Sequence, residues 1–134
     1  MCDTNTCIYA MRGAKAGKFA HVADTFKKKS EQGLSMSAIT LAELEFGVAY
    51  SSRPEQNAAA LLQFLVLFEL MPFEGAAAAE YGKIRADLKR RGLPIGPNDM
   101  LIAAHAKSLG HILVTSNCRE FERVDGLQTE DWMF

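Results

Sequence analysis

Residues 93–121 read LPIGPNDMLIAAHAKSLGHILVTSNCREF, and this stretch decides the fold that we expect. After the Gly96-Pro97 break, Asn98 and Asp99 open a helix that is expected to end at Gly110. Residues 111–115 then form a short run without polar alternation, which is typical of a strand buried on both faces. Sites in parallel sheets form outside the carboxyl ends of the strands. The turn at Asp99 and the polar turn over residues 115–120 are therefore candidate site positions.

The rest of the chain alternates between short strands and amphipathic helices in the same way. This alternation predicts an α/β domain with a parallel sheet and right-handed crossovers. Its 134 residues are enough for a single domain, 1–134, with a core of its own. We expect strands over residues 34–36 and 69–71, a final edge strand within 124–134, and helices over 7–13, 18–32, 37–50, 58–68 (starting from Pro54) and 74–91.

The composition limits the kinds of partner and compartment. With a formal net charge of -1, the chain has no overall basic field, so any nucleic-acid binding needs a local patch. The cysteines Cys2, Cys7 and Cys118 are odd in number and lack metal-binding spacing, which predicts reduced thiols in a cytoplasmic protein. Asp3 comes too early for a signal peptide, and no apolar run is long enough to span a membrane.

Four acidic residues stand out, and each also has a purely structural interpretation. Asp3 follows a strand of only two residues, where an N-cap is common. Glu43 fits a capping box that starts at Thr40, although the helix around it is apolar on nearly all sides and is expected to be buried. Periodicity alone does not choose between Glu43 and Glu45 on that helix. Asp99 is a natural helix cap, and Glu120 a natural surface charge.

Taken together, the acids at positions 3, 43, 99 and 120 predict a carboxylate cluster, because the strand ends bring several of them to one edge. Close carboxylates repel one another unless a cation joins them. Oxygen ligands suit Mg²⁺ or Mn²⁺, which supports hydrolysis of phosphodiesters. The histidines lack ligand spacing, and His105 is expected to be a hydrogen-bonded core residue.

Four segments resemble, in order, the motifs of VapC-type toxins of the PIN-domain superfamily. They are DTNTCIY (3–9), SAITLAELEFG (37–47), PIGPNDMLIAAHA (94–106) and TSNCREFERVDGL (115–127). The resemblance covers nearly the whole chain. One departure is that fewer hydrophobic residues precede the first aspartate than is usual in the family.

The resemblance implies a three-layer α/β/α domain with a central, mainly parallel sheet, and a ribonuclease that uses Mg²⁺ or Mn²⁺. It assigns catalysis to Asp3, Glu43 rather than Glu45, Asp99 and Glu120, with Asp3 and Asp99 as metal ligands. Asn117 stands where many family members have a further aspartate, so the resemblance gives that role to Glu120. Supporting polar positions fall on Asn5, Thr115 and Asn117.

The resemblance also implies partners: a VapB-type antitoxin, an RNA substrate such as initiator tRNA cut in its anticodon stem-loop, and a second copy of the chain. Residues 58–68 are a candidate groove wall or dimer face, although a core helix explains them equally well. A basic stretch with Arg85, Lys89, Arg90 and Arg91 is a candidate RNA contact, with a solvated helix face as the alternative. The alternative function is a PIN-like module that binds RNA or a partner without cleaving it.

Overall fold

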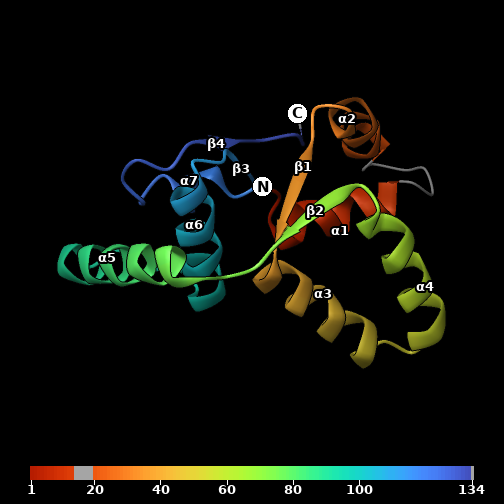
Figure 1. The fold of residues 1–134 in the computed structure, drawn as a ribbon, viewed down its shortest axis with the longest axis horizontal. Coiled ribbons are helices and arrows are strands. Elements are labelled where there is room, and N and C mark those ends of the chain that lie inside the picture. Colours follow the sequence, from red (N-terminus) through yellow and green to blue (C-terminus); the bar gives the residue numbers. More distant parts are fainter. Residues whose placement is uncertain (14–19, 134) are drawn as a thin grey trace.

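The structure is a computed structural model, and it describes residues 1–13 and 20–133 (Figure 1). Helices and strands alternate along most of the chain, as the sequence predicts. The elements are α1 (Thr4–Gly13), α2 (Ala20–Ser30), β1 (Leu34–Ser37), α3 (Ala38–Tyr50), α4 (Pro54–Leu65), β2 (Phe68–Met71), α5 (Gly75–Arg91), α6 (Pro97–Leu109), β3 (Leu113–Val114), α7 (Cys118–Phe121) and β4 (Thr129–Glu130).

The strands form two parallel pairs, β1 with β2 and β3 with β4. The first residues of the chain join these pairs. Cys2 N–H donates to the carbonyl of Ser35 in β1 at 3.1 Å, and Asp3 N–H donates to that of Val114 in β3 at 2.9 Å. Cys2 also forms a parallel bridge with Val114. The spatial order is therefore β2, β1, residues 1–3, β3, β4, and the predicted parallel sheet is confirmed.

Successive side chains along the strands of this sheet point to opposite faces and pack into two different hydrophobic cores. Met1 and Leu113 pack with residues of α5, α6 and α7, whereas Cys2 and Val114 pack with residues of α1 to α4. Figure 1 shows the same division, with α5, α6 and α7 on one side of the strands and α1, α3 and α4 on the other. The three-layer arrangement is confirmed.

Helices α3 and α4 depart from the sequence-based expectation. The helix around Glu43 is not buried on all sides, because Phe46 is 68% exposed and Tyr50 is 83% exposed. In α4, Leu61 is buried but Leu62 is 68% exposed. The helix also ends at Leu65 rather than at Phe68, which belongs to β2. Apolar composition in these helices therefore marks an uncovered surface as well as a core.

Smaller predictions can also be compared with the structure. The N-cap of α3 is Ser37, whose side chain accepts the Ile39 N–H at 3.1 Å, so the interpretation of Glu43 as part of a capping box was wrong. Helix α6 is confirmed, and it ends at Gly110, which has a φ of 67°. The beginning of the predicted helix 18–32 lies outside the described residues. No helix among residues 1–13 and 20–133 is long and apolar enough to cross a membrane.

Candidate active site

The candidate active site lies where the central strands end. Asp3 directly follows the strand-like residue Cys2, and Thr115 directly follows β3. Helix α3 starts at the carboxyl end of β1 and carries Glu43. Because these strands are parallel, their carboxyl ends lie at one edge of the sheet. The first turn of α6 adds Asp99, and α7 adds Glu120.

Asp3 is buried, with only 4% of its surface exposed. Its Oδ1 accepts the Thr6 N–H at 2.9 Å, so Asp3 caps the start of α1 as well as lying in the cluster. Burial raises its pKa, hydrogen bonding from Thr115 and Thr6 opposes that rise, and the charge of Glu43 adds to it. The predicted N-cap role and the predicted site position thus belong to the same carboxylate.

Glu43 is half-buried and is held in place by neutral donors. The Thr4 hydroxyl donates to its Oε1 at 2.5 Å, and the Asn98 amide donates to its Oε2 at 3.4 Å. Glu45, the alternative on the same helix, is exposed. The structure therefore places Glu43 rather than Glu45 beside the other acids.

Asp99 lies in the first turn of α6 without capping it. The N-cap is Gly96, which offers no side chain, and Pro97 begins the helix. The pKa of Asp99 is raised from 3.8 to about 6 by burial, followed by repulsion from Glu120, Asp3 and Glu43. A carboxylate that repels three others in this way marks the centre of the cluster.

Glu120 is held by two donors from neighbouring segments. The Gly96 N–H donates to its Oε1 at 3.2 Å, and the side-chain amide of Asn117 donates to its Oε2. Asn117 is itself oriented by Thr115, whose Oγ1 accepts the Asn117 N–H at 2.9 Å. Thr115 is fully buried and also hydrogen-bonds Asp3. The short turn after β3 therefore connects Asp3 to Glu120 through a chain of hydrogen bonds.

The acidic residues of the cluster do not form a closed cage for a metal ion. Within the described part of the chain, no group of three or more His, Cys, Asp or Glu residues is arranged to hold a metal ion. Mg²⁺ retains several waters and needs only one or two direct carboxylates, so this spacing is compatible with it. The donor set consists of oxygen atoms, and burial, followed by repulsion from neighbouring carboxylates, raises the pKa of Asp3 and of Asp99. The residues fit a hydrated divalent cation.

Some predicted positions lie apart from the cluster. Asn5 is exposed in the first turn of α1. On α5, the Arg85 guanidinium donates to the Tyr81 hydroxyl at 3.0 Å, and Arg91 pairs with Asp87. Lys89 and Arg90 are exposed on the same helix. Arg85 and Lys89 line a pocket of about 350 Å³ that also includes Ile95 and Met100, the residues adjoining Gly96 and Asp99.

Sequence reasoning missed the donors that hold the acids. These are Thr4, Thr6 and the Gly96 amide, together with the side chain of Asn98, which was expected only to open a helix. Polar residues next to each acid in the chain were the available signal. The pairing of Thr4 with Glu43, however, joins residues 39 positions apart, and only the fold reveals it.

Comparison with known proteins agrees with this geometry. The family model described as the PIN domain matches residues 1–127. This chain belongs to the PIN-domain family, within its VapC group. It is 44% identical over 132 residues to the tRNA(fMet)-specific endonuclease VapC of Shigella flexneri, covering 98% of this chain and 96% of that protein. It is 38% identical to ribonuclease VapC2 of Rickettsia felis, with the same two shares covered.

Solved structures show the same PIN-domain fold. A chain in the crystal structure of DNA-bound VapBC from Salmonella typhimurium matches with a TM-score of 0.90 and 41% identity, covering 98% of this chain and 96% of that one. A chain of VapBC2 from Rickettsia felis, bound to a DNA fragment from its promoter, matches with a TM-score of 0.89 and 36% identity, covering 98% and 97%. The predicted family is therefore confirmed.

Proposed function

We propose that this chain, as a single PIN domain of residues 1–134, is the toxin of a type II toxin-antitoxin system and an endoribonuclease that uses Mg²⁺ or Mn²⁺. The observation that carries the proposal is the gathering of Asp3, Glu43, Asp99 and Glu120 at one edge of the sheet, where burial and then the other three charges raise the pKa of Asp99. Placing several carboxylates close together costs folding free energy, and such clusters are typical of sites where a cation and a substrate phosphate bind. The VapC relatives named as endonucleases and ribonucleases support the same activity.

The contacts of each acidic side chain indicate its role in the proposed reaction. Asp3 and Asp99 would hold the ion, since burial and then neighbouring carboxylates raise the pKa of each of them. Glu43 and Glu120 are fixed by neutral donors, and in these positions their carboxylates would accept hydrogen bonds from the waters of a bound ion. A bound divalent ion supplies a water of lowered pKa and stabilises the leaving oxygen of the phosphodiester. Hydrogen bonds from Thr115 and Asn117 hold the carboxylates of Asp3 and Glu120 in position.

We propose that the substrate is RNA, and specifically initiator tRNA cut in the anticodon stem-loop. The printed name of the Shigella relative, a tRNA(fMet)-specific endonuclease, supports this choice. The basic face of α5 supports it as well, because exposed Lys89 and Arg90 provide a local cationic surface on a chain whose net charge is -1. An RNA substrate implies that the protein acts in the cytoplasm.

The test is cleavage of purified initiator tRNA in Mg²⁺ or Mn²⁺, followed by sequencing of the new RNA ends. We expect a discrete cut that EDTA abolishes and that Asp99→Asn removes without unfolding the protein. Glu45→Gln is the matched control, because Glu45 is an exposed acid two residues from Glu43. Cleavage that persists in EDTA would reject the metal mechanism. Tight RNA binding without any product would instead support the non-cleaving alternative.

We further propose that a VapB-type antitoxin binds beside the acids. A groove of about 380 Å³ runs between α1, α3 and α4, with Ile8, Met11, Leu44 and Val48 in its apolar lining and Glu43 at its edge. An apolar segment of a partner fits this groove, and an arginine on it would pair with the neighbouring carboxylates. The related VapBC complexes show that VapC chains assemble with a partner.

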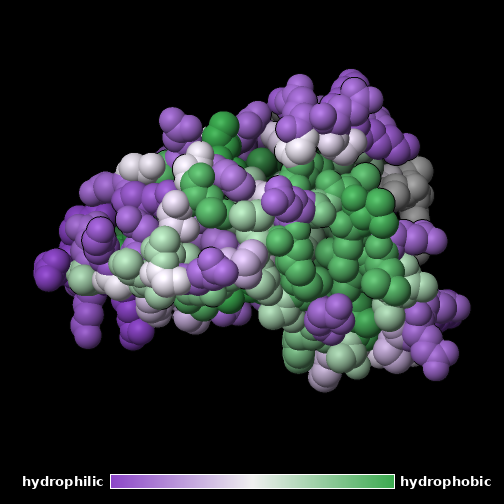
Figure 2. All heavy atoms as spheres, viewed as in Figure 1, coloured by the Kyte–Doolittle hydropathy of each residue, from purple (hydrophilic) through white to green (hydrophobic). Residues whose placement is uncertain are grey.

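A homodimer is the remaining proposed assembly. Figure 2 shows hydrophobic side chains gathered over α3, α4 and β2 on the face in view. The exposed large apolar residues of these elements are Phe46, Tyr50, Leu62 and Leu70, and the rings of Phe46 and Tyr50 stack with centroids 5.6 Å apart. A continuous apolar surface of this kind is typical of a protein interface.

A further inference from the structure

A buried histidine–serine pair joins the helix that carries Asp99 to the start of the helix that carries Glu43. His105 of α6 is 1% exposed and Ser37 is 0% exposed, and the His105 Nδ1 lies 2.7 Å from the Ser37 Oγ. Ser37 is the last residue of β1 and the N-cap of α3, where its Oγ accepts the Ile39 N–H at 3.1 Å. The pair therefore connects α6 directly to the first turn of α3.

The directions of these hydrogen bonds follow from the groups involved. His105 also forms a hydrogen bond with the backbone of Pro72, directly after β2. A proline has no N–H, so its carbonyl accepts, and the ring nitrogen that donates to it is Nε2, because Nδ1 faces Ser37. Burial lowers the pKa of His105, so the ring is neutral at pH 7 and its Nδ1 carries no proton. The Ser37 hydroxyl therefore donates to Nδ1, while its oxygen accepts from Ile39.

A second contact joins the same two helices at the acidic cluster. The Asn98 amide donates to the Glu43 Oε2 at 3.4 Å, and Asn98 directly precedes Asp99. Glu43 lies six residues after Ser37. Asn98 lies seven residues before His105. At about 1.5 Å of rise per residue, the two contacts are about 9 Å apart along α3 and about 10 Å apart along α6. Two contacts with matching separations hold the helices in one register.

The hydrogen-bonded pair fixes this register more specifically than apolar packing does. Ile39 packs against the core that contains Ile102 and Ala103 of α6, but hydrophobic attraction has no preferred direction. Moving α6 by one residue would shift Asp99 by about 1.5 Å and leave the buried imidazole and hydroxyl without partners. A displacement of about 1 Å can slow a reaction about 100-fold. The pair thus opposes the shifts that would disturb the acidic cluster.

We propose that His105 is a positioning residue for the acidic cluster. Its hydrogen bond with Ser37 fixes α6 against α3 and thereby sets the distance between the carboxylates of Asp99 and Glu43. Its hydrogen bond to Pro72 holds the ring in the tautomer that accepts from the Ser37 hydroxyl. Because Asp99 and Glu43 are assigned to one divalent ion, the role of His105 rests on the proposed nuclease function. The affinity for Mn²⁺ is the property that His105 controls.

Two substitutions of His105 separate its two hydrogen bonds. In His105→Asn, the side-chain oxygen takes the place of Nδ1 and accepts the Ser37 hydroxyl, whereas His105→Gln places its amide near Nε2 and keeps only the hydrogen bond to Pro72. We expect His105→Gln to bind Mn²⁺ about tenfold more weakly than the unsubstituted protein, and His105→Asn to bind it more tightly than His105→Gln. The EPR signal of free Mn²⁺ measures this affinity in the whole protein, below the Tm of each variant.

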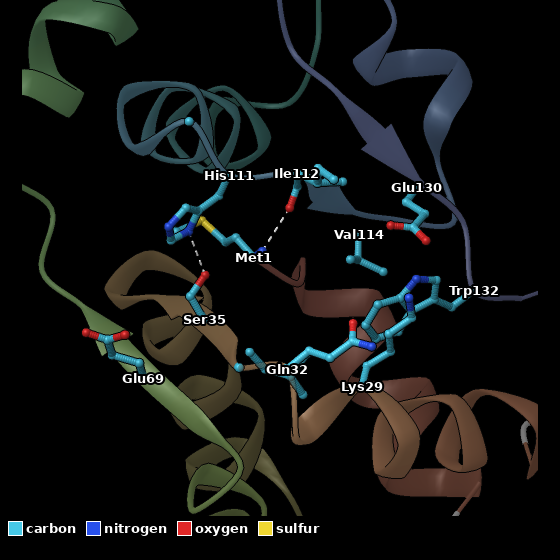
Figure 3. Close-up of a pocket in the computed structure, with 13 residues that line it drawn as sticks. Met1, Lys29, Gln32, Ser35, Glu69, His111, Ile112, Val114, Glu130 and Trp132 are labelled. Atoms are coloured by element: carbon cyan, nitrogen blue, oxygen red, sulfur yellow. Dashed lines mark hydrogen bonds between the residues drawn. The ribbon is translucent and has the colours of Figure 1, made fainter.

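A histidine that only filled space would give the opposite order, because asparagine is smaller than glutamine and leaves the larger cavity. If His105→Asn binds Mn²⁺ no more tightly than His105→Gln, the proposal is overturned. His111→Gln is the matched control, because the His111 Nδ1 lies 2.9 Å from the Ser35 Oγ at the other end of α6 from Asp99 (Figure 3). It should leave the affinity for Mn²⁺ unchanged, and a tenfold loss in this control would equally overturn the proposal.

Substitutions of the partner give a second test in which the histidine is unchanged. Threonine and glycine are about equally good N-caps, but only threonine keeps the hydroxyl that donates to His105. Ser37→Thr should therefore bind Mn²⁺ about tenfold more tightly than Ser37→Gly. Equal affinities of these two variants would show that the hydroxyl does not position the acids.

Cleavage of initiator tRNA is measured in parallel, so that the nuclease function and the role of His105 can fail separately. If the variants bind Mn²⁺ in the expected order but the unsubstituted protein cleaves no RNA, the nuclease function is wrong and the positioning role stands. Cleavage by the unsubstituted protein, with equal Mn²⁺ affinity in all the variants, would reject the positioning role alone. An unsubstituted protein that binds no Mn²⁺ would reject both.

Discussion

Replacing Asp99 by asparagine removes a charge from the acidic cluster while keeping the size and shape of the side chain. Burial, followed by repulsion from Glu120, Asp3 and Glu43, raises the pKa of Asp99 from 3.8 to about 6. At 1.36 kcal/mol per pKa unit, a shift of that size is equivalent to about 3 kcal/mol for a fully shielded group. Asp99 is only half-buried, so screening by water reduces this to roughly 1–2 kcal/mol. In metal-free protein at pH 7.5, Asp99→Asn should be more stable by that amount.

The sign of the pH dependence follows from linkage. Between pH 3.8 and about 6, the folded protein binds a proton at Asp99 more tightly than the unfolded chain does. The free energy of unfolding therefore falls as pH rises through this range and levels off above it. The variant lacks this contribution, so the stability difference between the two proteins should shrink as pH approaches 4.

Thermal unfolding in EDTA, from pH 4 to pH 8, measures both effects. For a chain of this length, 1–2 kcal/mol corresponds to a gain of about 4–8 °C in Tm at pH 7.5. Adding Mg²⁺ should then raise the Tm of the unsubstituted protein more than that of the variant. Asp24→Asn, an exposed aspartate on α2, is the control. A variant that is less stable than the unsubstituted protein at pH 7.5 would refute the idea of a strained acidic cluster.

Three further outcomes are expected. Glu43→Gln should slow tRNA cleavage by about 10–100-fold, because an oriented carboxylate is lost, whereas equal losses in Glu45→Gln would contradict the assignment. Thr4→Val should reduce the affinity for Mg²⁺, measured by the metal dependence of cleavage, and Thr4→Ser should restore it, since serine keeps the hydroxyl that binds Glu43. Phe46→Ser should weaken self-association in sedimentation without lowering Tm, because Phe46 is 68% exposed; a large loss of Tm would show that Phe46 supports the fold instead.

Much of the fold follows from short-range signals in the chain. Gly92 and Gly110 end helices α5 and α6 with φ values of 67°. Of the run 111–115 that was predicted as a strand buried on both faces, only Leu113 and Val114 form β3 and are buried, whereas Ile112 is 43% exposed. The histidine prediction also holds, since His105 is buried with its Nδ1 2.7 Å from the Ser37 hydroxyl. Burial raises the pKa of Cys2 to about 12, in keeping with a structural thiol.

The sequence alone could not predict features that depend on packing between segments far apart in the chain. Apolar residues around Glu43 predicted a buried helix, but the same pattern also describes a helix with an uncovered apolar face, such as that of Phe46. The choice of Glu43 over Glu45 depends on contacts with Thr4 and Asn98, which lie far away in the chain. Periodicity describes a helix face, whereas only the tertiary fold determines what lies against it.

Residues 1–3 connect the two strand pairs of the sheet, and these contacts explain how Asp3 is positioned. Asp3 N–H donates to the carbonyl of Val114 on one side, and Cys2 N–H donates to that of Ser35 on the other, so β1 and β3 both hold this strand. The Asp3 side chain is then fixed from the following helix by Thr6 N–H. Ordering of the acid thus comes from its neighbours across the sheet and from α1.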